Sequence, residues 1–162
     1  MDIGSPNYVL EFMKEMQKPL TSSKIQNSAY MLQTKGQGFP KGTYNFKYRS
    51  PLIFMNSPML TLEISGLGKE GHITESIQRE QRLFNINPKY NLSQNTFDKR
   101  YINFIKNHLD NIEPISLMTF LKNEKPGSIE KYLINKASSL TKIEDEKSLN
   151  DAAIASQLFW NL

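Results

Sequence analysis

Cysteine is absent from this sequence, so the chain can form neither a disulfide nor a thiolate metal site. The chain also lacks any run near the roughly 18 consecutive apolar residues that a membrane-spanning helix needs. Its first residues, MDIGSPNYVL, include an acid where a secretory signal peptide has lysines. Together these absences argue against a secreted or membrane-embedded protein, and we expect a soluble protein of the cytoplasm.

Length and composition favour one folded unit. The chain has 162 residues, close to the usual size of a single domain. Hydrophobic residues make up 38% of it and charged residues 22%, and the apolar residues recur in periodic clusters, which disordered chains seldom show. We therefore predict a single domain over residues 1–162.

Positive charge is concentrated in the first half of the chain. The formal net charge is only +4, but between Lys14 and Leu62 seven cations face a single acid, Glu15. Such a surplus attracts phosphate backbones, an acidic protein partner or anionic lipid, because each needs only a concentrated positive field. A solvated lysine-rich surface is the alternative, since lysine also keeps proteins soluble.

Two helices are predicted at the start of the chain. Ser5 and Pro6 form the cap-plus-proline signature of a helix N-terminus, and Pro19 ends the apolar periodicity that follows. A second helix begins at a cap supplied by one of residues 21–23 and ends at Gly36.

A strand and a third helix are predicted next. Residues 42–49 alternate aromatic and polar side chains with a period of two, which indicates a half-buried strand with its aromatic side inward. Pro51 breaks this pattern before a short apolar run, residues 52–55. Ser57 and Pro58 then start a third helix, whose end we place at the glycines that follow, Gly66, Gly68 and Gly71.

The order of these elements predicts the fold class. Residues 72–77 and 83–87 indicate two short strands joined by the charged turn 78–81. Helix, helix, strand, helix and hairpin is the order of a winged helix-turn-helix, which we predict over residues 5–88. Residues 89–162 carry only helical periodicity, starting with a helix capped by Thr96. The expected class is α+β and mostly helical, with a winged helix-turn-helix-like N-terminal half and a C-terminal helical subdomain.

Three short motifs stand together in the first half: Lys24-Ile25-Gln26-x-x-x-Tyr30-x-Leu32-Gln33, Tyr44-x-Phe46-x-Tyr48, and Ser57-Pro58 followed by Leu60, Leu67, Gly71 and Ile73. They resemble the uncharacterised YwgA-like proteins and their distant relatives, the Panacea-type (SocA-like) antitoxin domains. The segment from Ile115 to Leu121, with Lys136 and Ala152 to Leu158, fits the C-terminal helices of that family.

The resemblance implies a winged-helix-like scaffold used in toxin neutralisation or regulation, with no catalytic residues to carry over. One departure stands out. Where the family has a compact G-P-Y-S turn, this chain has Ser50-Pro51 and then Leu52 to Asn56 before Ser57, which indicates an insertion.

Two motifs formally match catalytic or phosphate-binding patterns. The stretch Gly66-Leu67-Gly68-Lys69-Glu70-Gly71 is G-x-G-x-x-G, but it follows a predicted helix and precedes a strand, the reverse of the phosphate-binding order. Ser139-Leu140-Thr141-Lys142 matches S-x-x-K without the rest of such an apparatus. Neither motif predicts an enzyme.

Metal ligands are few. His72 and His108 are the only histidines, and neither stands on a predicted helix with a second ligand three or four residues away. Two carboxylates can hold a magnesium ion, so a nuclease that uses a lysine with Glu63, Glu70, Glu75 and Glu80 is an alternative, although the usual strand-borne spacing is missing. We expect no catalytic residues, no metal and no cofactor.

The polar residues of the third predicted helix indicate whether this protein could read a DNA sequence. In a winged helix this element enters the major groove, but here its polar positions offer Thr61, Glu63 and Ser65 and no Arg, Asn or Gln. Lysines elsewhere, with Arg79 and Arg82, could still bind DNA phosphates without recognising a base sequence. The aromatic side chains Tyr44, Phe46, Tyr48 and Phe54 either stack bases or pack the core, and Phe159 and Trp160 either anchor an interface or dock the last helix.

We therefore predict a non-enzymatic regulatory binding protein, antitoxin-like or a regulator, that acts through a protein partner. A DNA-binding winged-helix transcriptional regulator is the first alternative and a metal-dependent nuclease the second. The contact residues predicted for a protein or nucleic-acid partner are the basic ones, Lys24, Lys35, Lys41, Lys47, Arg49, Arg79 and Arg82.

Overall fold

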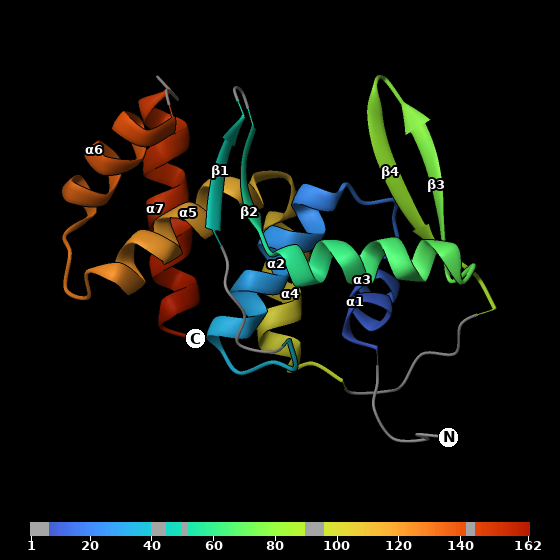
Figure 1. Ribbon diagram of the computed structural model, residues 1–162. Helices are drawn as coiled ribbons and strands as arrows, with labels where there is room; N and C mark the ends of the chain where they lie inside the picture. The colour runs from blue at the N-terminus through green and yellow to red at the C-terminus, as the bar shows by residue number, and fades with distance from the viewer. Residues whose placement is uncertain (1–6, 40–44, 50–51, 90–95, 142–144) are drawn as a thin grey trace.

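The computed structural model describes residues 7–39, 45–49, 52–89, 96–141 and 145–162, and of residues 45–49, 52–56 and 140–141 it describes the backbone alone. The described chain is α+β and mostly helical, as predicted (Figure 1). Its elements in chain order are α1 (Tyr8–Met16), α2 (Ser22–Thr34), β1 (Asn45–Arg49), β2 (Leu52–Asn56), α3 (Pro58–Lys69), β3 (Ile73–Gln78), β4 (Gln81–Ile86), α4 (Lys99–His108), the 3-10 helix η1 (Leu109–Asn111), α5 (Ile112–Glu124), α6 (Glu130–Thr141) and α7 (Glu146–Trp160).

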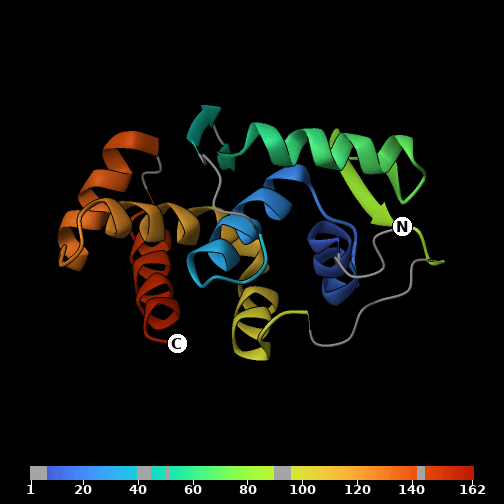
Figure 2. The ribbon, with the colours of Figure 1, turned by 60° about the horizontal axis from the view of Figure 1, so that its bottom comes forward.

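Helix α2 lies at the centre of the described fold (Figure 2). It contacts α1, β2, β4 and α5, so it joins the N-terminal elements to the C-terminal helices. Its residues Ile25, Met31 and Leu32 are fully buried. The other helices of the second half, α6 and α7, pack on α5 and on each other.

The hydrophobic core runs through both halves without a break. Phe12 of α1, Ile105 of α4 and Phe159 of α7 belong to the same buried cluster. The ring of Phe159 lies 5.0 Å from that of Phe104 and 5.8 Å from that of Tyr101. Phe159 therefore docks the last helix, one of the two roles considered for it, while Trp160 beside it is half-buried.

The strands form two separate antiparallel hairpins, β1–β2 and β3–β4. The second hairpin confirms a prediction, with Arg79 and Glu80 as its two turn residues. A single residue ahead of α2, Leu20, adds to the outer side of β4: its N–H donates to the Phe84 carbonyl at 3.0 Å and its carbonyl accepts from the Phe84 N–H at 2.7 Å. These bonds attach the hairpin to the helices.

Strand β2 was not predicted, because an apolar run without alternation gives no period-two signal. It pairs with β1 in a register that places Lys47 opposite Phe54 and Arg49 opposite Leu52. Residues 42–44 and the side chains of both strands lie outside the described residues, as does the expected inward aromatic side of β1. Both α2 and α5 contact β2.

Two predicted helix caps were wrong. Helix α1 is capped by Asn7 instead of Ser5, because the Asn7 side chain accepts the N–H of Leu10 at 3.1 Å. Helix α4 is capped by Asp98 instead of Thr96. In each case the acceptor sits next to the first helical residue, where it reaches the unpaired N–H groups of the first turn. Thr21 and Ser57 cap α2 and α3, within the choices that the sequence allowed.

The predicted end of the third helix was also wrong in part. Helix α3 continues through Gly66 and Gly68 to Lys69, and of the three glycines only Gly71 adopts a positive φ, +82°. Glycine weakens a helix by only about 1 kcal/mol. The burial of Leu60, Ile64 and Leu67 along one side of α3 outweighs that cost.

The cap of α7 makes a testable contribution to acid stability. The Asp145 carboxylate accepts the backbone N–H groups of Lys147 and Ser148 and the Ser148 hydroxyl. The Ser148 bonds come first among the causes that hold the pKa of Asp145 below its usual 3.8. Because the folded pKa is depressed, this stabilisation is complete above the ordinary pKa and is lost as pH falls through the folded value. We expect acidification from about pH 5 to about pH 2 to lower the melting temperature of Asp145→Asn by less than it lowers that of the wild type, because the asparagine amide still caps the helix and does not titrate. An equal fall in both proteins would contradict this role.

Candidate functional site

Lys24, the first of the predicted contact residues, is held within the protein. Its Nζ donates to Glu113 Oε2 at 2.8 Å and to the carbonyl oxygen of Asp110 at 3.0 Å. The side chains of the pair are only 23% and 12% exposed. Ser23 donates to the same carboxylate at 3.2 Å, so this cluster fastens the start of α2 to the start of α5.

Lys35 is likewise engaged within the chain, just after the end of α2. Its Nζ donates to the carbonyl oxygen of Trp160 at 3.0 Å, at the C-terminal end of α7. The ammonium also lies 5.6 Å from the ring centroid of Tyr101 and 5.3 Å from that of Phe159. Desolvation, with a smaller contribution from the charge of Arg100, lowers the pKa of Lys35. A cation at a helix C-terminus complements the dipole there.

The remaining predicted contacts lie elsewhere. Arg79 stands in the β3–β4 turn and Arg82 on β4, where its Nε is 3.7 Å from Glu75 Oε2. Lys41 lies outside the described residues, as do the side chains of Lys47 and Arg49. The four described cations are thus not brought together: two join α2 to the C-terminal helices, and two belong to the hairpin on the other side of the protein (Figure 1).

A groove of about 770 Å³ separates α3 from the β3–β4 hairpin. Its lining comes from α2, α3 and both strands of the hairpin, with both signs of charge present. We call it the hairpin groove, and its lining residues are Ser22, Thr61, Ile64, Ser65, Gly68, Lys69, Ile73, Thr74, Glu75, Arg82 and Phe84.

Helix α3 is set in place by a buried side chain of α2. Gln26, only 1% exposed, accepts the N–H of Ser57 at 2.7 Å and donates to Thr61 Oγ1 at 3.1 Å. It also donates to the hydroxyl of Ser22 at 3.0 Å. Since Ser57 is the N-cap of α3 and Thr61 lies one turn further on, this one amide holds the first turn of α3 against α2.

The outward side of α3 exposes two large apolar side chains. Met59 is 75% exposed and Leu62 is 73% exposed, although Leu60, Ile64 and Leu67 of the same helix are buried. Gly66 follows on the same side one turn later, with no atom within 4 Å of where a Cβ would stand. We call Met59, Leu62 and Gly66 the α3 face. Sequence reasoning missed it, although both apolar residues fall outside the helical stripe of 60, 64 and 67.

The acid on α3 sits beside that face. Desolvation raises the pKa of Glu63. A carboxylate at this position disfavours the approach of a phosphate backbone to α3, because like charges repel. Lys69 at the other end of the helix lines the hairpin groove.

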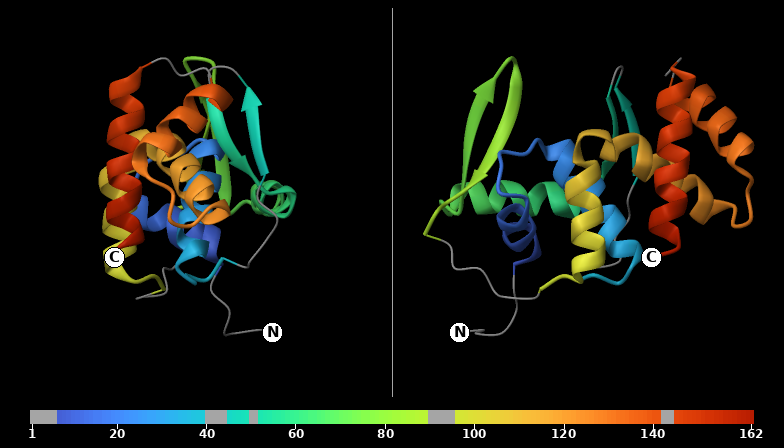
Figure 3. Two further views of the ribbon diagram at one scale, coloured as in Figure 1. Left: turned by 90° about the vertical axis from the view of Figure 1, so that its left-hand side faces the viewer. Right: turned by 180° about the vertical axis from the view of Figure 1, so that it is seen from behind.

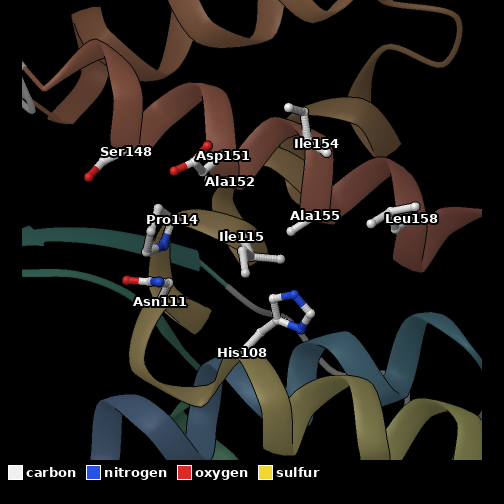
Figure 4. Close-up of a pocket in the computed structure, with 10 residues that line it drawn as sticks. All are labelled: His108, Asn111, Pro114, Ile115, Ser148, Asp151, Ala152, Ile154, Ala155 and Leu158. Atoms are coloured by element: carbon white, nitrogen blue, oxygen red, sulfur yellow. The ribbon is translucent and has the colours of Figure 1, made fainter.

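A second, smaller hollow of about 260 Å³ lies between α7 and the corner formed by α4, η1 and α5. In Figure 4, His108 and Ile115 face Asp151 and Ala155 of α7 across it. The His108 ring stacks on Phe104 with centroids 4.1 Å apart, and its Nδ1 lies 2.8 Å from the Phe104 carbonyl oxygen. The exposed rim is apolar, formed by Ile154 and Leu158.

The histidines and acids do not gather into a metal site among the residues that the structure describes. His72 Nε2 lies 3.4 Å from Glu70 Oε2, and both side chains are exposed. In the S-x-x-K motif, Ser139 belongs to α6 and Lys142 lies outside the described residues. None of the helices described is both long and apolar enough to cross a membrane.

Comparison with known proteins gives no further guidance: no protein-family model, curated protein or solved structure matches this chain.

Proposed function

We propose that this chain is a non-enzymatic regulatory binding protein, antitoxin-like or a regulator, that engages a protein partner through the α3 face and the adjoining hairpin groove. The observation that carries the proposal is the exposure of Met59 and Leu62, about three quarters of each side chain, on one side of a well-anchored helix. Burying such a side chain contributes about 1.5–3 kcal/mol. A protein surface can supply that burial, whereas the phosphate-lined surface of DNA supplies little of it.

We infer a winged-helix arrangement for the first half, with α3 in the place of the recognition helix. The order α1, Leu20, α2, α3, β3, β4 supports this, because Leu20 pairs with β4 as the short third strand of such a sheet. The strand of this arrangement is thus Leu20, between α1 and α2, and not the strand expected from residues 42–49, which pairs with β2 instead. Of the β1–β2 hairpin, only β2 falls within the insertion that the sequence indicated at residues 50–56, and β1 corresponds to the aromatic strand of the resemblance. In this arrangement the α3 face is the surface that a partner meets first.

A DNA-binding regulator is the second candidate, and two cations favour it. Lys69 and Arg82 both line the hairpin groove, where a winged helix would approach the phosphate backbone. The outward side of α3 argues against base reading, because the α3 face presents Met59 and Leu62, with Glu63 beside them, instead of bidentate donors. Arg82 is moreover close to an internal carboxylate, Glu75.

The protein-partner proposal is tested by replacing one apolar side chain of the α3 face. We expect Leu62→Lys to reduce the amount of partner captured from the native host at moderate salt by about tenfold or more, because the partner would have to desolvate a lysine where it covers Leu62 in the wild type. Ile154→Lys is the matched control, because Ile154 is also exposed but lies on α7. Equal capture by wild type and Leu62→Lys would contradict a role for the α3 face.

The DNA alternative has its own signature. Binding of a mixed-sequence duplex, followed by fluorescence anisotropy, should weaken steeply between about 50 and 200 mM salt. DNA binding should also weaken in two double variants, one with Lys69→Ala and Arg82→Ala and the other with Lys47→Ala and Arg49→Ala. The Leu62→Lys variant should bind DNA as well as the wild type or more tightly. That combination would favour the DNA-binding regulator over the protein-partner proposal.

A further inference from the structure

Strand β3 is an open edge. Among the described strands it pairs only with β4, whose other side is taken by Leu20. Figures 1 and 3 show the distal part of the hairpin standing clear of the helices. An edge strand carries a row of unpaired N–H and C=O groups that can pair with another strand.

The register identifies which backbone groups face outward. In a hairpin with a two-residue turn, the residues that flank the turn, here Gln78 and Gln81, exchange hydrogen bonds, and bonded pairs then alternate with non-bonded ones. Glu75 opposite Phe84 is thus a non-bonded pair. Phe84 confirms this, since its N–H and C=O bond to Leu20 on the other side. By the same alternation, the backbone groups of Ile73, Glu75 and Ile77 face away from β4.

Near its tip, the β3–β4 hairpin carries a large exposed apolar side chain and charged turn residues in a strained backbone conformation. Ile77 is 76% exposed, near the tip of the hairpin. The two turn residues, Arg79 and Glu80, have φ values of 48° and 65°, a conformation that favours asparagine and glycine in such turns. Charged residues therefore occupy the tip at a conformational cost.

We propose that two copies of this chain associate through antiparallel pairing of their β3 strands, in a register centred on Ile77. In that register Ile77 lies opposite Ile77 of the second copy. Glu75 lies level with Arg79, the first turn residue beyond β3, at both ends of the pairing. The Glu75–Arg79 contact therefore occurs twice in a two-fold interface, whereas the Ile77 contact lies on the axis and occurs once. The β3 edge is therefore complementary to itself in charge and in apolar character.

The two neighbouring registers do not share this property. Centred on Ser76, the pairing places Ile77 opposite Glu75 at both ends, so neither the apolar nor the charged side chain meets a complementary one. Centred on Glu75, it places the two Glu75 carboxylates opposite each other, and like charges directly opposed across strands are destabilising. In the register centred on Ile77, the strands overlap only over the distal half of each hairpin. The two bodies then lie at opposite ends of a four-stranded sheet, because the distal part of each hairpin stands clear of the helices of its own chain (Figure 1).

The pairing is short, so the dimer should be weak. It buries less than the roughly 800 Å² per partner of a standard stable interface, and we expect a dissociation constant on the order of 0.1 mM. The association does not depend on the function proposed above.

Sedimentation velocity of the full chain from about 10 µM to about 1 mM tests the proposal. We expect the mass to rise from 18.7 kDa towards twice that value. Glu75→Arg and Arg79→Glu should each weaken the association at least about tenfold, because each places two pairs of like charges across the interface. The double variant, which swaps the two charges, should return to within about threefold of wild type.

A backbone readout and a matched control make the test specific. Exchange of the Ile77 amide, followed by NMR, should slow as concentration rises, whereas the Ser76 amide, bonded to β4 in the monomer, should not change. Glu130→Arg on α6 alters net charge as Glu75→Arg does and should leave the association unchanged. A mass of 18.7 kDa at every concentration would overturn the proposal. So would dimerisation with an unaltered Ile77 amide or without rescue by the charge swap.

Discussion

Replacing Gly38 with alanine will lower the free energy of unfolding by about 2–3 kcal/mol. Gly38 adopts a φ of +75°, and a Cβ built on it would lie 2.2 Å from Cε1 of Tyr8. The tyrosine ring has little room to withdraw, because its centroid lies 5.8 Å from that of Phe39 and 6.1 Å from that of Phe97. Urea denaturation followed by circular dichroism measures the change.

Gly36 provides the matched control for Gly38. It has a similar φ of +68°, but no atom lies within 4 Å of where its Cβ would stand. Gly36→Ala therefore carries only the backbone strain, about 1 kcal/mol. The difference between the two variants isolates the contact with Tyr8. Equal losses of stability would mean that the aromatic cluster adjusts freely and that the contact contributes nothing.

Gln26→Leu will lower the free energy of unfolding by about 2–3 kcal/mol, although leucine is close to glutamine in volume. The substitution leaves the N–H of Ser57 without its acceptor in a buried position and removes the bonds to Ser22 and Thr61. Because these bonds set the start of α3, we also expect weaker capture of the partner, measured on the same samples as Leu62→Lys.

The control for Gln26 stands two turns later on the same helix. Gln33 is partly exposed and lies near the end of α2, away from α3, so Gln33→Leu should change stability by less than about 0.5 kcal/mol. If Gln26→Leu were as mild as Gln33→Leu, the hydrogen bonds of Gln26 would not be what places α3. Loss of stability with full partner capture would separate the structural role of Gln26 from the proposed docking role of the α3 face.

Local patterns were enough to predict most of the elements. The helical spacing of Leu60, Ile64 and Leu67 predicted the buried side of α3, and Ser57 with Pro58 predicted where that helix starts. The β3–β4 hairpin was predicted from alternation on either side of a charged turn. Each of these signals acts between residues a few positions apart, which is the range over which caps, turns and periodicity work.

The candidate site was less predictable. Charge counting selected Lys24 and Lys35 as contact residues, but their partners, Glu113 and the carbonyl of Trp160, lie far along the sequence. Net charge along a segment says nothing about which cations are neutralised by folding. The α3 face was not predicted, because an apolar residue that stays exposed in the folded protein looks the same in a sequence as one that becomes buried.

The sequence by itself determined the class of fold, the order of most of its elements and the absence of cysteine chemistry, because these follow from composition and from spacing along the chain. Only the tertiary structure decided which lysines are hydrogen-bonded within the chain and that Gln26 anchors α3. It also decided that Leu20 pairs with β4 and that the other edge of the hairpin, β3, is left without a partner strand among the described residues. Those properties depend on contacts between residues distant in sequence, whose energies exist only once the helices have packed.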